Sequence, residues 1–93
     1  MKGTEKQIAW AQEIKAAYKH NAELIKNYPG MNPMNITFVE KVEAFLDSLE
    51  DAGAVIDNFK TIQKTDNVAE AFKRIASLRM FSDGVKKIAQ SMR

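Results

Sequence analysis

The chain has 93 residues, of which 45% are hydrophobic and 28% are charged, and its formal net charge is +2. These values fit one globular unit with a single core and exclude a disordered tail. The absence of cysteine excludes disulfides, thiol nucleophiles and thiolate metal sites. No apolar run approaches the roughly 18 residues of a membrane span, and the first residues lack the apolar stretch of a secretory signal. We therefore expect one domain over residues 1–93, located in the cytoplasm and without membrane contact.

The first predicted element is a long amphipathic helix over residues 4–27. Thr4 and Gln7 have the spacing of a capping box, in which each side chain bonds to the backbone N–H of the other residue. Apolar side chains then recur at helical spacing around Ile14, and Trp10 belongs to this stripe. The pattern predicts a helix that buries one face along its whole length.

The positions of two polar residues on this helix predict different surroundings for their side chains. Asn21 lies within the apolar stripe, which predicts a buried amide that bonds to nearby backbone or a part of the stripe that faces a partner. His20 lies at the edge of the polar face and is the only histidine, so we expect a solvated imidazole rather than a metal ligand. The Tyr28-Pro29-Gly30 sequence then predicts the end of the helix.

The start of the second helix has two candidate signals. Residues 31–35 are expected to form a loop or a short helical turn, and Asn32 followed by Pro33 suits a helix cap and first position. A second capping box at Thr37 and Glu40 predicts that the main helix begins there.

The second helix is expected to run to about Ala52, with Gly53 as a C-terminal cap or kink. Residues 54–64 also have helical spacing, and they fit either a separate short helix or a bent continuation. Asn67, with Glu70 three residues later, predicts the cap of the next helix.

A last helix is expected over residues 85–92, after a break at Ser82-Asp83-Gly84. No segment alternates with period two for long, so we expect an all-α bundle of four to five helices and no sheet. The core is predicted to centre on Trp10, Ile14, Phe38, Val42, Phe45, Phe59, Phe72 and Ile75.

The charges are unevenly distributed along the chain. Residues 37–59 carry one lysine against six carboxylates, whereas residues 60–93 carry eight basic against three acidic side chains. These segments are expected to attract each other, within the fold or across a homodimer, unless one of them meets a charged partner.

Four carboxylates spaced three or four residues apart form one face of the second helix: Glu40, Glu43, Asp47 and Glu50. Acid–base catalysis needs carboxylates in a cleft that separates their pKa values, and a row on a helix surface lacks that setting. We therefore expect no catalytic residue, no metal site and no cofactor. This acidic face is the predicted contact surface for a basic partner.

The alternative contact surface is basic and lies in the last two helices: Lys73, Arg74, Arg79, Lys86 and Lys87. Several such charges would bind nucleic-acid phosphates without sequence preference. Four apolar residues flank loops, where they either close the ends of the core or make contacts: Met31, Met34, Met80 and Phe81.

The opening GTEKQIAWAQEIK resembles the openings of short helical proteins of phages, plasmids and integrative elements of Gram-positive bacteria. The matching positions lie within residues 3–15: Gly3, Thr4, Glu5, Lys6, Gln7, Ile8, Trp10, Ala11 and Ile14. The resemblance implies a protein that acts inside a bacterial host by binding rather than by catalysis.

Three functions are therefore expected in order. The first is a non-enzymatic protein that inhibits or modulates a host protein or ribonucleoprotein such as a CRISPR effector, as an anti-CRISPR protein does. The second is a small DNA- or RNA-binding accessory protein that uses the basic C-terminal face. The third is a structural homodimer with complementary acidic and basic faces.

Overall fold

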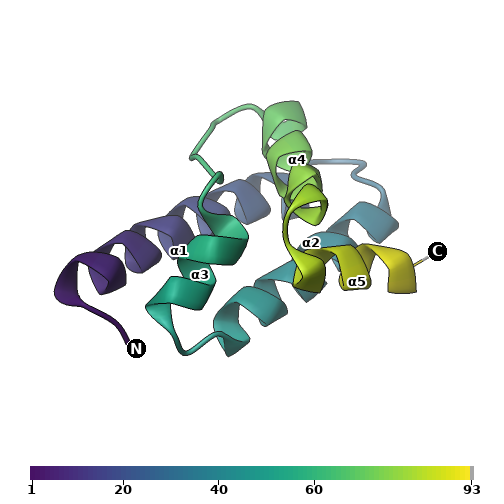
Figure 1. The fold of residues 1–93 in the computed structure, drawn as a ribbon. Helices are drawn as coiled ribbons and strands as arrows, with labels where there is room; N and C mark the ends of the chain where they lie inside the picture. Colours follow the sequence, from purple (N-terminus) through teal and green to yellow (C-terminus); the bar gives the residue numbers. More distant parts are fainter. Residues whose placement is uncertain (93) are drawn as a thin grey trace.

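The computed structural model of the chain describes residues 1–92. The described residues form five α-helices and one short 3₁₀ turn (Figure 1): α1 (Glu5–Lys26), α2 (Pro33–Ser48), α3 (Ala52–Phe59), α4 (Val68–Ser77), η1 (Leu78–Met80) and α5 (Asp83–Ser91). They include no strand beyond one isolated bridge. The predicted all-α class and the long N-terminal helix are confirmed.

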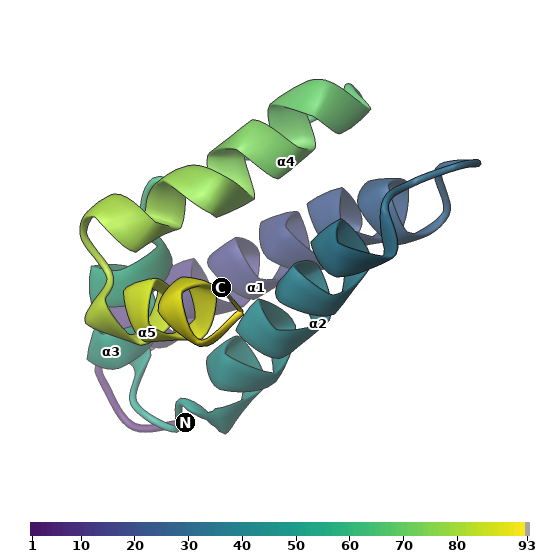
Figure 2. The same cartoon turned by 90° about the vertical axis from the view of Figure 1, so that its right-hand side faces the viewer.

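Helix α1 is the centre of the arrangement, since α2, α3 and α4 all pack against it. Helices α1 and α2 run antiparallel, and α3 and α5 lie at the end where α2 finishes (Figure 2). Helix α4 packs mainly on α1, and η1 connects it to α5. The sides of α2 and α4 that face each other are therefore left without a helix between them.

The start of each α-helix is set by one side chain that accepts a backbone N–H bond, at Thr4, Asn32, Asp51, Asn67 and Ser82. The Thr4 hydroxyl accepts from the Gln7 N–H at 3.2 Å, and Gln7 Oε1 accepts from the Thr4 N–H at 3.0 Å, which confirms the first capping box. Asn67 Oδ1 accepts from the Glu70 N–H at 2.9 Å, as predicted. Because Ser82 is a cap, α5 begins at Asp83 and not at residue 85.

The predicted start of α2 at Thr37 is wrong. Helix α2 begins one turn earlier, because Asn32 Oδ1 accepts from the Met34 N–H at 2.9 Å and Pro33 occupies the first helical position. Thr37 therefore lies inside the helix, where its hydroxyl donates to the Pro33 carbonyl at 3.0 Å.

The predicted end of α2 at Ala52 is also wrong. The helix ends at Ser48, and Asp51 starts a new helix by accepting from the Gly53 N–H at 2.7 Å. Gly53 is thus in the first turn of α3 and is no C-terminal cap. Residues 54–64 contain most of a separate short helix followed by a loop.

The first residues of the chain hold the turn between α2 and α3. The Lys2 N–H donates to the Glu50 carbonyl at 2.9 Å, and the Lys2 carbonyl accepts from the Ala52 N–H at 2.7 Å. Gly3 follows with φ +138°, and a Cβ there would lie 3.0 Å from the Ala52 Cβ. Only glycine adopts this backbone conformation readily. Gly3 therefore suits the latch, by which we mean the two backbone hydrogen bonds of Lys2 to Glu50 and Ala52, and this role is separate from helix capping.

The core lies where α1, α2, α3 and α4 meet, and Phe59 is fully buried in it. The Phe59 ring contacts Tyr18 edge-on at a centroid distance of 5.8 Å and Phe45 at 5.9 Å. Seven of the eight predicted core residues are buried or partly buried.

Trp10 is the exception among the predicted core residues, because 47% of it is exposed. The buried seam of α1 runs through Ala11, Ile14, Tyr18, Ala22 and Ile25. At 100° per residue, the centre of that seam is turned about 80° away from Trp10. The indole is therefore left at the edge of the buried face.

Gly84 is expected to resist substitution because α5 packs on the ring of Phe45. A Cβ added at Gly84 would overlap the Phe45 ring. Glycine-to-alanine changes inside helices usually stabilise by roughly 1 kcal/mol. We expect Gly84→Ala instead to lower the free energy of unfolding by about 1–3 kcal/mol, measured by urea denaturation. In a Phe45→Ala background this cost should disappear; an equal loss in both backgrounds would contradict the overlap.

Candidate functional site

The predicted acidic face is largely an ion-pair cluster between α1 and α2. Glu43 lies 3.4 Å from Lys19 Nζ and 3.1 Å from Lys26 Nζ, and Asp47 lies 3.1 Å from Lys19 Nζ. Within residues 1–92, the ion pairs of the acidic segment are therefore made with α1 and not with the basic C-terminal segment. Only Glu40 and Glu50 of the four carboxylates are exposed without an ion pair to another residue in 1–92.

The same cluster changes the titration of its neighbours. The hydrogen bond to Asp47 raises the pKa of Lys19. Burial lowers the pKa of Lys26, but its bonds to Glu43 and Glu23 outweigh that and raise the pKa overall. The Tyr18 hydroxyl donates to the Val39 carbonyl at 2.7 Å, and burial, followed by the charges of Glu43 and Asp47, raises the pKa of Tyr18 above its usual range.

We expect the fold to lose stability in alkali through Tyr18. Above about pH 10 the unfolded state releases the phenol proton, whereas the folded state keeps it. The folded state then binds more protons, so the free energy of unfolding falls by about 1.4 kcal/mol per pH unit from this group. The raised pKa values of Lys19 and Lys26 act in the same direction. Urea denaturation between about pH 9 and pH 11 measures the slope, which Tyr18→Phe should make shallower; identical slopes would contradict the assignment.

Asn21 and His20 both hold the loop between α3 and α4. Asn21 is fully buried, its amide donates to the Gln63 carbonyl at 2.8 Å, and its Oδ1 accepts from the Thr65 N–H at 3.0 Å. This confirms the prediction of a buried amide that bonds to backbone. His20 lies at the surface with 31% of its side chain exposed, and its Nε2 is 3.0 Å from Asp66 Oδ1, so the predicted solvated imidazole also contacts this loop.

The basic residues of the C-terminal segment lie in different local surroundings. Arg79 and Lys86 line the same cavity of about 390 Å³, beside the exposed Met80. Arg74 instead folds toward the α3–α4 loop, with its Nη1 3.4 Å from Gln63 Oε1. Lys73 and Lys87 are exposed but do not line that cavity. None of these cations forms an ion pair with another residue of the described range 1–92.

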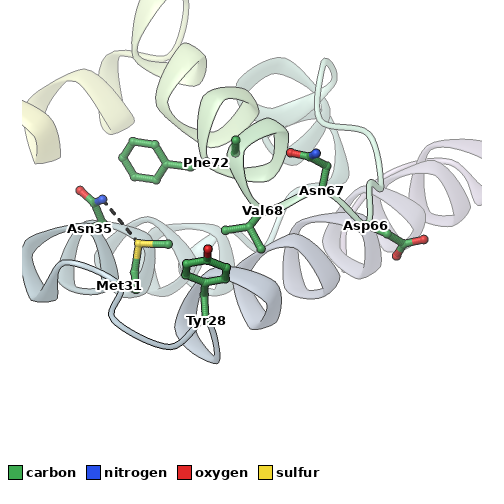
Figure 3. A pocket seen from close by; sticks show the side chains of 8 residues that line it. Tyr28, Met31, Asn35, Asp66, Asn67, Val68 and Phe72 are labelled. Carbon is green, nitrogen blue, oxygen red and sulfur yellow. Dashed lines mark hydrogen bonds between the residues drawn. The ribbon is translucent and has the colours of Figure 1, made fainter.

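A groove between α2 and α4 consists of two neighbouring cavities that share lining residues. The first, of about 640 Å³, is drawn in Figure 3 and is lined by Tyr28, Met31, Asn35, Asp66, Asn67, Val68, Ala69 and Phe72. The second, of about 370 Å³, is lined by Met34, Asn35, Phe38, Phe72, Ala76, Arg79, Ala89 and Met92. Because Asn35 and Phe72 line both, we treat them as one site, the α2–α4 groove.

The groove follows from how α4 packs. Ala71 and Ile75 of α4 are buried in the core, so the stripe that carries Val68 and Phe72 is turned toward α2. Phe72 contacts Phe38 of α2 edge-on at a centroid distance of 6.5 Å, and this pair forms the floor. The walls combine apolar side chains with a few polar ones and are open to water.

The rim of the groove holds large apolar side chains that the fold does not cover. Tyr28 is 52% exposed and Met34 is 58% exposed. Met31 and Met92 also line the groove, and methionine side chains adapt to differently shaped surfaces. The sequence marks Met31 and Met34 only as apolar residues beside a loop, and places Phe72 in the core.

Comparison of the chain with protein-family models, with curated proteins and with solved structures finds no match. Within residues 1–92, none of the helices combines the length and the apolar character that crossing a membrane requires. The same residues bring together no group of three or more histidine, aspartate and glutamate side chains able to hold a metal ion.

Proposed function

We propose that the chain is a non-enzymatic binding protein that holds apolar side chains of a partner protein in the α2–α4 groove. The observation that carries this proposal is a floor formed by the buried Phe38 and the partly buried Phe72, with the exposed Tyr28 and Met34 at the rim. Exposed apolar side chains gathered around a concave surface favour contact with another protein.

The shape and charge of the groove favour a protein over a small apolar ligand. The groove is open along its length, so one side of any occupant stays in water. Its two ends carry opposite charges, Asp66 at one and Arg79 at the other. An occupant with an apolar face and a polar, charged remainder fits both properties.

The kind of genetic element that encodes the chain and the target on which it acts are predicted only from residues 3–15. That opening supports a protein of a phage or mobile element that acts in the cytoplasm of a bacterial host. The target would be a host protein or ribonucleoprotein such as a CRISPR effector. The acidic face contributes to such a contact only through Glu40 and Glu50, since Glu43 and Asp47 are held by α1.

The experiment compares two variants that replace an exposed apolar side chain with aspartate, in affinity capture from a Gram-positive bacterial lysate. Met34→Asp puts a charge into the groove, and an acidic side chain at this first-turn position is compatible with the helix dipole. Trp10→Asp is the control, because Trp10 is 47% exposed and does not line the groove or the cavity beside it. We expect a partner that the wild type and Trp10→Asp retain and Met34→Asp loses.

Other outcomes would overturn the proposal. Loss of the partner in Glu40→Lys and Glu50→Lys, with Met34→Asp unaffected, would move the contact to the acidic face. A concentration-dependent dimer in sedimentation equilibrium that Met34→Asp abolishes would make a second copy of the chain the occupant.

The cations near α5 support a second candidate function, the binding of DNA or RNA. Arg79, Lys86 and Lys87 have no ion-pair partner within residues 1–92, so they are available to phosphates. Affinity for a labelled oligonucleotide should then fall steeply with salt. A Lys86→Glu/Lys87→Glu variant should lose it, whereas Met34→Asp should keep it.

A further inference from the structure

The occupant of the α2–α4 groove has a secondary structure that the groove itself selects. This inference rests on the function proposed above. The described residues offer no free strand edge to which an extended peptide could add, because their one β-bridge joins Lys2 to Asp51. An extended peptide in the groove would have no strand with which to pair its backbone N–H and C=O groups. A helix satisfies those groups internally, so a helix suits this site.

The length of the occupant follows from the α4 side of the groove. The groove extends from Val68 to Arg79, which are eleven positions apart along α4 and η1. At 1.5 Å per residue that distance is about 16 Å, or three turns of helix. The floor made by Phe38 and Phe72 lies between these ends and is entirely apolar.

The charges at the two ends set the direction of the occupant. Arg79 lines both the groove and the adjoining cavity, where Lys86 adds a second cation. Asp66 lies at the opposite end, with 91% of its side chain exposed. The C-terminal end of a helix carries partial negative charge and the N-terminal end partial positive charge. An occupant parallel to α4 therefore places each end against the opposite charge.

We infer that the groove binds an amphipathic helix of about three turns that runs parallel to α4 and carries an acidic side chain at its C-terminal end, against Arg79 and Lys86. The apolar face of this helix covers Phe38 and Phe72, and its polar face stays in water.

The test uses three synthetic helical peptides of about three turns, with one leucine stripe and Glu, Gln or Lys at the C-terminal end. Fluorescence anisotropy gives their affinities, and amide chemical shifts of the full chain locate them. We expect the Glu peptide to bind about 3- to 10-fold more tightly than the Lys peptide and to shift the amides around Phe72 and Met92. In Arg79→Glu/Lys86→Glu this preference should reverse.

The matched control is Lys73→Glu/Lys87→Glu, which makes the same change in charge away from that cavity and should keep the preference for Glu. Thermal unfolding of each variant checks that it is folded.

If the three peptides bind the groove equally, the inference of an acidic C-terminal end is wrong and the proposed function stands. If none of them shifts the amides of the groove, the inference of a helical occupant is wrong, and the capture experiment with Met34→Asp tests the proposed function separately. If an oligonucleotide binds at Arg79 and Lys86 and the peptides do not, this surface binds nucleic acid and the inference of a helical partner is wrong.

Discussion

Phe59→Ala is expected to lower the free energy of unfolding by about 3–5 kcal/mol, in line with other truncations of buried phenylalanine. Phe59 is fully buried and its ring lies between those of Tyr18 and Phe45. A domain of this size has a total stability on the order of 5–15 kcal/mol. The substitution therefore removes a large part of that stability, which urea denaturation followed by circular dichroism will measure.

The control for Phe59 is a larger aromatic side chain outside the core. Trp10→Ala removes more atoms but should cost less than about 1 kcal/mol, because the indole is half exposed. If the two truncations were equally costly, Trp10 would have to be covered and the arrangement of α1 would be wrong.

Asn21→Leu is expected to cost about 2–5 kcal/mol, although leucine is similar in size and more apolar. The substitution leaves the Gln63 carbonyl and the Thr65 N–H without their partners at the edge of the core. Each buried polar group left unpaired costs about 1–3 kcal/mol. Hydrogen exchange should show faster exchange of the Thr65 amide, and urea denaturation should show the loss of stability.

The neighbouring His20 provides the control for Asn21. Its bond to Asp66 joins a partly covered imidazole to an exposed carboxylate, so His20→Ala should cost less than about 1 kcal/mol. A Thr65 amide that stays protected in Asn21→Leu would show that the loop is held by other contacts.

The parts of the fold that sequence predicts well are those decided within a few residues. Thr4 and Asn67 were recognisable as caps because the residue that completes each motif is three positions away. The start of α2 could not be decided in this way, since Asn32 and Thr37 both carry a valid signal. The helix starts after Asn32 because Pro33 already fixes the φ angle of the first helical residue. Nucleating the helix there therefore costs less free energy than nucleating it at Thr37.

The candidate site could be predicted only in fragments. Met31 and Met34 were visible as apolar residues near a loop, but the groove needs Phe72, which comes from more than thirty residues later. Phe72 stays partly uncovered because α4 packs on α1 and not on α2. No pattern within a few residues of Phe72 determines against which helix α4 packs. The prediction of a free acidic face was incomplete for a related reason, because the lysines that form ion pairs with Glu43 belong to another helix, α1.

The latch formed by Lys2 has a practical consequence for labelling the protein. Met1 and Lys2 lie beside the α2–α3 turn, whereas Met92 lines the groove. A fluorophore or affinity handle joined on the C-terminal side of Met92 would therefore follow a residue that lines the surface under test. A handle joined before Met1 avoids that interference, provided that a flexible spacer leaves both backbone bonds of Lys2 unstrained.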